Sequence, residues 1–350
     1  MVDVDERVNE AVPAGPFRAW LRSAVPEAAG EITVERLSGG ASNLTFRVRT
    51  EEDRAGWVLR RPPLGQVLAT ANDMAREHTV QRALATTDVP VPRIVAWCDD
   101  DSVIGAPFYL MEWLDGVVYA DAAAAAHLTE SEARAASHAL VDVLAALHMV
   151  DPTAVGLGEF GRPQGFLERQ LRRWATQWER STDRRSPAVE ETLARLADRL
   201  PEGDRTGIVH GDYSFNNVMY ARRRPAEVLA VLDWEMSTVG DPLTDVGMLL
   251  TYWGDAGEIM WRNRSPQAHR ANPGYPPAGE LASRYAAATG TDVADLDFYV
   301  ALATVKLAVI SEGAARRLGE TSPDRAARTR ETVDALADLA LKTIGGPIAG

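Results

Sequence analysis

The polar residues near the middle of the chain constrain its fold more than any other feature. Asp212 precedes Asn217 by five residues, and Asp233 directly follows an apolar run. The apolar segments 218–220 and 228–232 predict two strands separated by a polar turn. In a hairpin, the start of the first strand lies opposite the end of the second, so Asn217 and Asp233 are expected side by side. The sequence therefore predicts that these oxygen-bearing side chains come within reach of one ion.

This set of side chains matches the requirements of phosphoryl transfer. A phosphoryl donor carries several negative charges, so its enzyme needs carboxylate and amide oxygens to hold Mg²⁺ and a separate carboxylate to take the acceptor's proton. Asp212 suits the role of base, and Asn217 and Asp233 suit the metal. Asp and Asn also cap turns, an alternative that explains each residue alone better than it explains the set.

Composition excludes several classes of protein. The chain has 350 residues and 46% hydrophobic content, enough for two lobes with separate cores. A net charge of −13 and a pI of about 5.0 argue against nucleic acid or an anionic membrane as a partner. Cys98 is the only cysteine, which predicts a core thiol in a protein of the reducing cytoplasm. The charged start of the chain is unlike a signal peptide, no apolar run approaches the length of a bilayer span, and the six histidines lack zinc spacing.

The pattern of apolar residues changes near Gly116. The expected strands before it are 31–37, 44–50, 56–61, 93–98 and 107–113, with a helix at 72–85. The expected helices after it are 129–148, 165–180, 187–199, 242–253, 279–288, 293–317 and 322–344. The sequence thus predicts an α+β fold with a β-rich lobe at 1–113 and a mostly helical lobe at 114–350. Two such lobes suit an enzyme that closes on its substrate.

Two features of the first lobe suit phosphate binding. Glycines in the loop 38–43 would let backbone N–H groups approach phosphate oxygens, although an ordinary hairpin turn explains the same residues. The candidate contacts in this loop are Ser38, Gly39, Gly40, Ser42 and Asn43. Arg60 ends a strand with a cation that could pair with donor phosphates, and Glu77 in the next helix could orient it. The alternative for both residues is an ordinary surface charge.

Four segments of the chain carry a family resemblance. They are 108–116, 209–220, 231–235 and 240–247. In these segments the chain resembles the aminoglycoside phosphotransferase and choline-kinase-like family, whose members are relatives of protein kinases. It is most similar to the branch related to the kinase-like domain associated with acyl-CoA dehydrogenases. The resemblance implies a bilobal protein-kinase-like fold and an enzyme that uses ATP and Mg²⁺.

The resemblance also implies a role for each matching residue. Asp212 would be the catalytic base, and Asn217 and Asp233 would hold Mg²⁺. The loop 38–43 would cover the phosphates, and Glu77 would orient the phosphate-binding cation. A hinge segment would hydrogen-bond adenine through its backbone, and it comprises Glu112, Trp113 and Leu114.

Three further positions complete the comparison with the family. Asp245 would brace the catalytic loop, and His210 would support that loop rather than transfer protons. Arg60 stands where most relatives with kinase activity have lysine. Arginine can bind phosphate through two N–H groups. We therefore expect arginine in place of lysine to affect the geometry and rate of transfer more than the binding of the phosphoryl donor.

The acceptor is less well defined by the sequence. Trp174 and Trp178 lie one helical turn apart and could stack on a flat substrate, or simply pack against neighbouring helices. Asp255 and Glu258 could suit an amine. The residues predict a hydroxylated small molecule, and the resemblance suggests either an aminoglycoside or a hydroxyacyl thioester.

Other classes of function remain as alternatives. A nucleotide-binding pseudokinase or regulatory module would use the same fold, but it would normally lack one of the base or metal residues. An acyl-CoA dehydrogenase would need a flavin-binding helical domain, which no part of this chain resembles. The expected assembly is a monomer or a homodimer.

Overall fold

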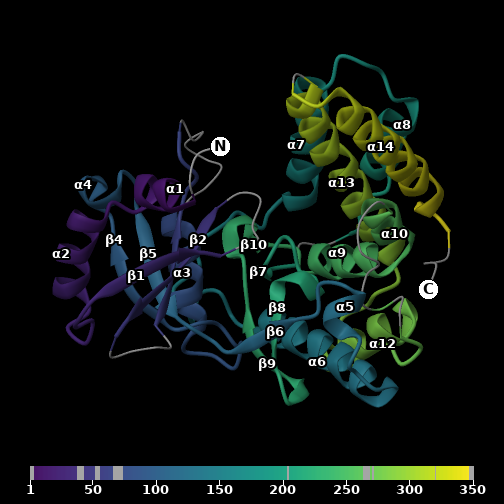
Figure 1. The fold of residues 1–350 in the computed structure, drawn as a ribbon. Helices are drawn as coiled ribbons and strands as arrows, with labels where there is room; N and C mark the ends of the chain where they lie inside the picture. Colours follow the sequence, from purple (N-terminus) through teal and green to yellow (C-terminus); the bar gives the residue numbers. More distant parts are fainter. Residues whose placement is uncertain are drawn as a thin grey trace. The chain divides into compact units, whose positions relative to one another are not determined.

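The computed structural model describes residues 4–37, 43–51, 56–65, 74–202, 205–262, 269, 272–319 and 321–346, which form two compact units (Figure 1). The first unit comprises Met1–Asp115 and Leu229–Ser237, and the second comprises Gly116–Val228 and Thr238–Gly350. The chain therefore returns to the first unit for a short segment that contains Asp233. The expected division after residue 113 had placed this segment in the second lobe.

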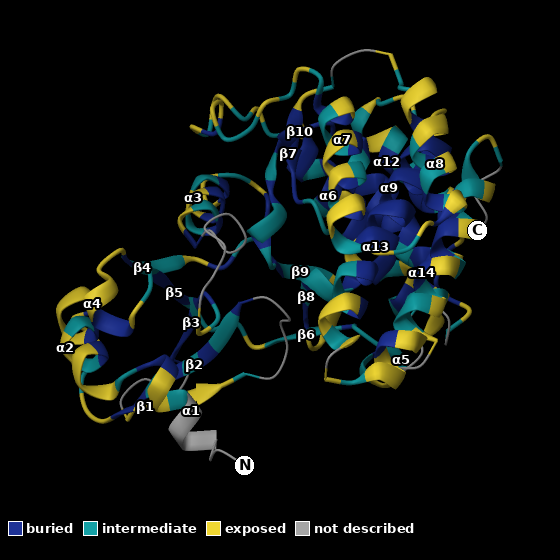
Figure 2. Cartoon of the chain, turned by 90° about the horizontal axis from the view of Figure 1, so that it is seen from above, coloured by how far each residue is buried: buried dark blue, intermediate teal, exposed yellow. Residues whose placement is uncertain are grey.

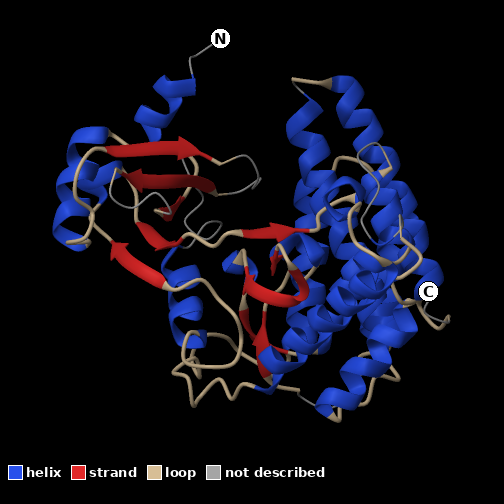
Figure 3. Cartoon of the chain, turned by 60° about the horizontal axis from the view of Figure 1, so that its bottom comes forward, coloured by secondary structure: helices blue, strands red, loops and turns tan. Residues whose placement is uncertain are grey.

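A five-stranded antiparallel sheet forms the centre of the first unit (Figure 3). Its strands are β1 (Ile32–Arg36), β2 (Leu44–Thr50), β3 (Trp57–Arg61), β4 (Ile94–Cys98) and β5 (Phe108–Glu112). They pair in the order β1-β2-β3-β5-β4. Each strand overlaps an expected one, so the predicted sheet is confirmed. The register pairs Arg60 of β3 with Tyr109 of β5, which brings both residues next to the helix that carries Glu77.

Successive side chains along a strand point to opposite faces of the sheet, so the first unit has a hydrophobic cluster on each face. Leu59 and Leu110 pack in one cluster with Phe17, whereas Val58 and Met111 belong to a second cluster. The helices of this unit are α1 (Val4–Ala11), α2 (Ala14–Ala24), α3 (Met74–Leu84) and α4 (Asp101–Ile104). The helix α3 matches the expected one, whereas α1, α2 and α4 were not anticipated from the sequence.

Short strands interrupt the helices of the second unit. They are β6 (Gly116–Val118), β7 (Gly207–Val209), β8 (Val218–Ala221), β10 (Thr238–Gly240) and β9 (Arg224–Val231), whose last three residues belong to the first unit. The strands β8 and β9 are neighbours in one sheet, which confirms the expected pair. The expected turn was too long, because the strand β9 already begins at Arg224. The polar side chains at its start are exposed or half-buried, so a polar pattern there is compatible with a strand.

Helices make up most of the second unit. They are α5 (Ala122–Ala125), α6 (Glu130–Met149), α7 (Phe166–Ser181), α8 (Pro187–Asp198), α9 (Leu243–Trp253), α10 (Asp255–Trp261), α12 (Ala278–Thr289), α13 (Leu296–Gly319) and α14 (Pro323–Thr343). All seven helices expected after Gly116 are present. Together with the sheet of the first unit, they confirm the α+β class. The segments η1 (Phe215–Asn217) and η2 (Trp234–Met236) are single 3₁₀ turns.

The helix α13 is the central helix of the second unit, and Figure 2 shows it together with α9 mostly in the colour of buried residues. By length and hydropathy α13 is the one helix of the described residues that could cross a bilayer, so the expectation that no segment reaches this length was wrong. However, 83% of its apolar window is buried inside the protein. Burial against neighbouring helices explains its apolar composition.

Candidate active site

The loop that carries Asp212 is held by a buried carboxylate. Strand β7 is buried throughout and leads directly into His210 and Gly211. Asp245 of α9 accepts hydrogen bonds from the backbone N–H groups of both residues, at 2.6 and 2.7 Å. Gly211 has φ +87°, a conformation that suits glycine and turns the chain sharply before Asp212. The brace that the resemblance implied for Asp245 is therefore present.

Asp245 is itself fixed by residues of two other helices. The Nε2 atom of His148 in α6 lies 3.3 Å from Asp245 Oδ2, and its Nδ1 atom lies 2.8 Å from the hydroxyl of Tyr285 in α12. Burial acts to raise the pKa of Asp245, but the hydrogen bond and charge of His148 and the N–H group of His210 outweigh it and leave the pKa below its ordinary value. The loop that carries Asp212 thus rests on an ionised carboxylate.

Asp212 and Asn217 lie together, as the sequence predicted. Asn217 Nδ2 donates hydrogen bonds to the backbone oxygen of Asp212 at 2.8 Å and to its Oδ2 atom at 3.2 Å. The hydroxyl of Tyr252 in α9 donates to Asp212 Oδ1 at 3.2 Å. Because the amide donor of Asn217 faces Asp212, its carbonyl oxygen is the atom left for a cation.

The first unit contains a second cluster, centred on Arg60. Its Nη2 atom lies 2.8 Å from Asp233 Oδ1, and its Nε atom lies 3.2 Å from Glu77 Oε2. Burial acts to lower the pKa of Arg60, but Tyr109 and the two carboxylates reverse the effect and raise it above its ordinary value. The structure shows the contact between Arg60 and Glu77 that the sequence suggested and adds Asp233 to it.

Glu77 is fully buried and has several hydrogen-bond donors. The Tyr109 hydroxyl donates to its Oε2 atom at 2.8 Å, and Asn43 Nδ2 donates to its Oε1 atom at 2.7 Å. Burial raises the pKa of Glu77, although Arg60 and Tyr109 act to lower it. Such an arrangement fixes the direction of the Arg60 guanidinium, which is the role expected for Glu77.

Asp233 adopts an unusual backbone conformation. It is the one non-glycine residue with positive φ in the described part of the chain, at 65°. The next residue, Trp234, is buried and anchors the turn, because its indole N–H donates to the Val231 carbonyl at 3.0 Å. Strained residues of this kind are concentrated at functional sites, where the surroundings hold them in place.

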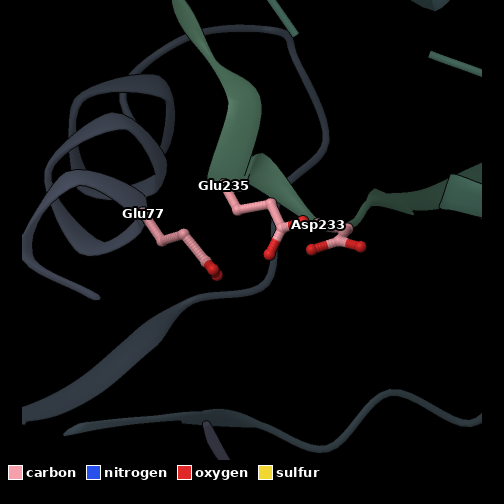
Figure 4. Close-up of side chains that lie close together, drawn as sticks. All are labelled: Glu77, Asp233 and Glu235. Atoms are coloured by element: carbon pink, nitrogen blue, oxygen red, sulfur yellow. The ribbon is translucent and has the colours of Figure 1, made fainter. Parts of the chain in front are cut away.

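A group of oxygen atoms around Asp233 fits a divalent cation. Carboxylate oxygens of Glu77, Asp233 and Glu235 all lie within 4.8 Å of one another (Figure 4). Asn43 Nδ2 bridges Glu77 and Glu235, and its Oδ1 atom is buried without a hydrogen-bond partner among the described residues. Glu77 and Asp233 both bind Arg60, and Glu235 accepts a hydrogen bond from Asn43, so a cation would share these carboxylates with the protein's own donors. Mg²⁺ prefers oxygen ligands, so the donor set fits it.

Glu235 was missing from the predicted site residues. The signal was available in the segment Asp233-Trp234-Glu235, where two carboxylates flank a tryptophan. Trp234 between them is buried, and the carboxylates of Asp233 and Glu235 lie close together. Lys306 of α13 was also missed; its Nζ atom donates to the Gly211 carbonyl oxygen at 2.6 Å.

The other predicted nucleotide contacts are only partly described. Ser38, Gly39, Gly40 and Ser42 lie outside the described residues. In the expected hinge, Glu112 accepts a hydrogen bond from the Arg93 N–H at 2.9 Å, and the Arg47 guanidinium lies 3.8 Å from the centre of the Trp113 ring. Leu114 is half-buried. The role of these residues in adenine binding stays a prediction.

The aromatic residues near Asp212 differ from those expected. Trp174 and Trp178 are buried in α7, so the packing alternative holds for both. The second unit has a different aromatic pocket, and one of its lining residues, Tyr252, contacts Asp212. Its lining comprises Tyr119, Ala120, Ser214, Phe215, Asn216, Leu249, Tyr252, Trp253 and His269. The rings of Phe215 and Trp253 are stacked, with centroids 5.4 Å apart.

Comparison with known proteins places the chain in a family. Residues 33–281 match the profile of the Phosphotransferase enzyme family. The chain belongs to this phosphotransferase family. It is 32% identical over 340 residues to mouse acyl-CoA dehydrogenase family member 10, and 31% identical over 360 residues to rat acyl-CoA dehydrogenase family member 11. These matches cover 95% and 97% of the chain but only 31% and 45% of the two relatives, so the chain spans less than half of their length.

Solved structures of phosphotransferases show the same fold. A Ralstonia eutropha JMP134 protein provisionally assigned as an aminoglycoside phosphotransferase is 33% identical, with a TM-score of 0.79 and coverage of 94% of this chain and 97% of that chain. Choline kinase from Cryptosporidium parvum Iowa II has a TM-score of 0.63 at 13% identity, with 93% of each chain covered. The GDP complex of aminoglycoside 2'-phosphotransferase-IIIa has a TM-score of 0.62 at 15% identity, with 93% and 97% covered. The last two matches concern the fold alone, and together the three confirm the predicted kinase-like fold.

Proposed function

We propose that the protein is an ATP- and Mg²⁺-dependent kinase that phosphorylates a hydroxyl group of a small molecule. The observation that carries this proposal is the pairing of Asp212 with Asn217 on a braced loop. Membership of the phosphotransferase family supports the reaction class, and a family relative's complex with GDP supports a nucleotide as the donor. The presence of all three base and metal residues favours an active enzyme.

In this proposal Asp212 is the catalytic base. Its carboxylate takes the proton of the acceptor hydroxyl as the acceptor oxygen forms a bond to the γ-phosphorus and the bond to the β–γ bridging oxygen breaks. Asn217 and Tyr252 hold the Asp212 carboxylate in one orientation through their hydrogen bonds. Asp245 keeps the loop in place during the transfer.

Residues of the first unit have the donor-binding roles. Arg60 binds phosphate oxygens of the donor, and Glu77 orients the guanidinium. Asp233 and Glu235 would hold Mg²⁺ from this unit, and Asn217 of the second unit stays a predicted ligand. When bound, Mg²⁺ neutralises charge that develops on the phosphate oxygens. The segment 112–114 binds the adenine ring.

The aromatic pocket next to Asp212 favours one class of acceptor. Among the described residues its lining contains no carboxylate, whereas a polycationic aminoglycoside would need several. Most of its other side chains are aromatic, and the rings of Phe215 and Trp253 pack against each other. Of the two acceptors suggested by the resemblance, the character of this lining therefore favours a hydroxyacyl thioester over an aminoglycoside.

The test is a panel of acceptors read by ADP release. Hydroxyacyl thioesters, aminoglycosides and amino alcohols are each incubated with ATP and Mg²⁺, and a phosphorylated product is identified by mass spectrometry. We expect release that depends on the acceptor, and a loss of about 10²–10⁴-fold in Asp212→Asn, because a positioned base contributes that much. Absence of acceptor-dependent release across the panel, or equal turnover in Asp212→Asn, would contradict the proposal.

One observation favours a second candidate, a catalytically weak nucleotide-binding module. Arg60 forms an ion pair with Asp233, the carboxylate assigned to the metal. If this pair persists in the presence of Mg²⁺ and nucleotide, turnover will be slow even though nucleotide binds. Calorimetry distinguishes the two, since the weak module binds nucleotide equally well with and without Mg²⁺.

A further inference from the structure

A lysine in the core of the second unit contacts the loop that carries Asp212. The chain has two lysines, Lys306 and Lys342, among its 37 lysine and arginine residues. Lys342 is exposed on α14, whereas Lys306 is 9% exposed in the middle of α13. A buried ammonium group costs free energy unless it is paired or hydrogen-bonded, so its surroundings need an explanation.

The Lys306 ammonium has one hydrogen bond to a backbone group. Its Nζ atom donates to the Gly211 carbonyl oxygen at 2.6 Å. The N–H group of the same residue, Gly211, donates to Asp245 Oδ1 at 2.7 Å. The N–H and C=O groups of Gly211 are therefore both hydrogen-bonded. The C=O group belongs to the peptide bond between Gly211 and Asp212. Rotation of that peptide would redirect the Asp212 side chain.

The charges around Lys306 come from several elements. Asp212 and Asp245 act to raise its pKa, whereas burial, which is the larger effect, and Arg173 of α7 lower it. The ring of Trp174, also on α7, lies 5.7 Å from Nζ, within the range of a cation–π contact. Lys306 thus interacts electrostatically with Asp212 of the loop and with Asp245 of α9, which braces that loop.

We propose that Lys306 is a positioning residue for phosphoryl transfer, which fixes the Gly211–Asp212 peptide and places a positive charge beside the Asp212 carboxylate. This inference rests on the proposed function of Asp212. A compact ammonium is needed, because the planar guanidinium of arginine presents its donors in a different geometry. A purely structural role would require only that the space be filled.

The variants Lys306→Met and Lys306→Arg separate these possibilities. Methionine fills a similar volume without charge, and arginine keeps the charge. We expect Lys306→Met to lower kcat by about 10²-fold, the loss typical of a small misplacement of a reacting group. The KM for ATP and the affinity for Mg²⁺-nucleotide by calorimetry should stay near the wild-type values. Lys306→Arg should recover part of kcat, and Lys342→Met, the exposed control, should behave as wild type.

A second measurement requires no turnover. In protein labelled with ¹⁵Nζ-lysine, Lys306 and Lys342 give the two side-chain signals. We expect Asp212→Asn to shift the Lys306 signal and leave the Lys342 signal in place. Such a shift supports the coupling even if Lys306→Met does not fold.

The outcomes distinguish the two proposals. An active wild type with an equally active Lys306→Met overturns the role of Lys306, as does a Lys306 signal that does not respond to Asp212→Asn. A drop in kcat that is matched by a loss of nucleotide affinity also overturns it, because that pattern indicates general disruption. A wild-type protein without turnover on any acceptor contradicts the kinase proposal alone.

Discussion

Arg60 and Asp233 form an ion pair of 2.8 Å in the first unit, although they are far apart in the sequence. The same guanidinium contacts Glu77, so one cation connects strand β3, helix α3 and the turn after β9. The residue proposed to bind donor phosphates and the residue proposed to bind the metal are therefore coupled. Any ligand that binds one of them changes the surroundings of the other.

Replacing Arg60 should weaken nucleotide binding. Hydrogen bonds to charged groups contribute about 1.5–3 kcal/mol, so we expect Arg60→Met to raise the Kd of Mg²⁺-nucleotide by about 10–100-fold. The melting temperature should also fall, because Glu77 then stays buried without its cation. Isothermal titration calorimetry and thermal unfolding measure the two effects.

The control for Arg60 is Arg49→Met on the neighbouring strand β2. Arg49 pairs with Glu35 at the surface, where an ion pair contributes about 0–1 kcal/mol. Arg60→Lys should retain more affinity than Arg60→Met. If Arg60→Met binds nucleotide as tightly as the control, the guanidinium does not contact the donor.

Local patterns in the sequence were enough to predict much of this fold. The strands of the first unit and the helices after Gly116 have clear periodicity, and structure and prediction agree there. The short helices α4 and α5 span four residues each and carry too few side chains for a period of 3.6 to be visible. The start of β9 was missed because its polar residues are exposed or half-buried, which hides the strand pattern.

The site was predictable in part for the same reason. Asp212 and Asn217 are five residues apart in the sequence, so one short segment was enough to assign both to the candidate site. Lys306 contacts Gly211 across about a quarter of the chain, and no local pattern marks a lysine in an apolar helix as a partner of a distant loop. Glu235 is two residues from Asp233, so the sequence did offer a signal for it that the prediction did not use.

Glu235→Gln should weaken the Mg²⁺ dependence of nucleotide binding. Glutamine keeps the size and one oxygen of the side chain but removes the charge that attracts a divalent cation. We expect the gain in affinity that Mg²⁺ gives the wild type to shrink, with less change in the binding of nucleotide alone. Calorimetry with Mg²⁺ and with a chelator provides the comparison. Asp233→Ala should remove the gain altogether.

Glu227→Gln is the matched control for Glu235→Gln. Glu227 lies on β9 in an ion pair with Arg224 and belongs to neither cluster. An unchanged Mg²⁺ effect in Glu235→Gln would show that this carboxylate is not part of the cation site. A similar loss in Glu227→Gln would indicate a general effect of acidic charge.

Asp245 should make the protein sensitive to acid. Its pKa in the folded protein lies below the ordinary value of about 3.9, so its ionised form contributes stability above that value. This contribution is lost as the pH falls through the lowered pKa. We expect Asp245→Asn to be destabilised by about 3–5 kcal/mol near neutral pH, the usual result of breaking a buried pair. The difference from wild type should shrink below about pH 4.

Thermal unfolding between pH 3 and pH 7 checks this expectation. Asp142→Asn serves as the control, because Asp142 pairs with Arg284 at the surface and should change stability by less than about 1 kcal/mol. A difference between Asp245→Asn and wild type that stays constant down to the lowest pH would mean that Asp245 does not stabilise the fold through its charge.

Gly247 should be sensitive to the smallest side chain. It lies in α9, and a Cβ atom at this position would be 2.6 Å from the carbonyl carbon and oxygen of Tyr299 in α13. Because backbone atoms of a packed helix cannot move away cheaply, we expect Gly247→Ala to destabilise the protein by about 1–3 kcal/mol. The shift also reaches Asp245 on the same helix, so turnover should fall together with stability.

Gly313→Ala in α13 is the matched substitution. The nearest atoms to its Cβ position, in Ser181 and Arg317, are at 3.5 and 3.6 Å, which is ordinary contact. Alanine is favoured over glycine inside a helix by about 0.5–1 kcal/mol, so this variant should be slightly more stable than wild type. Urea unfolding of both variants measures the contrast. If Gly247→Ala is as stable as Gly313→Ala, the helices α9 and α13 are not packed as closely as their backbones indicate.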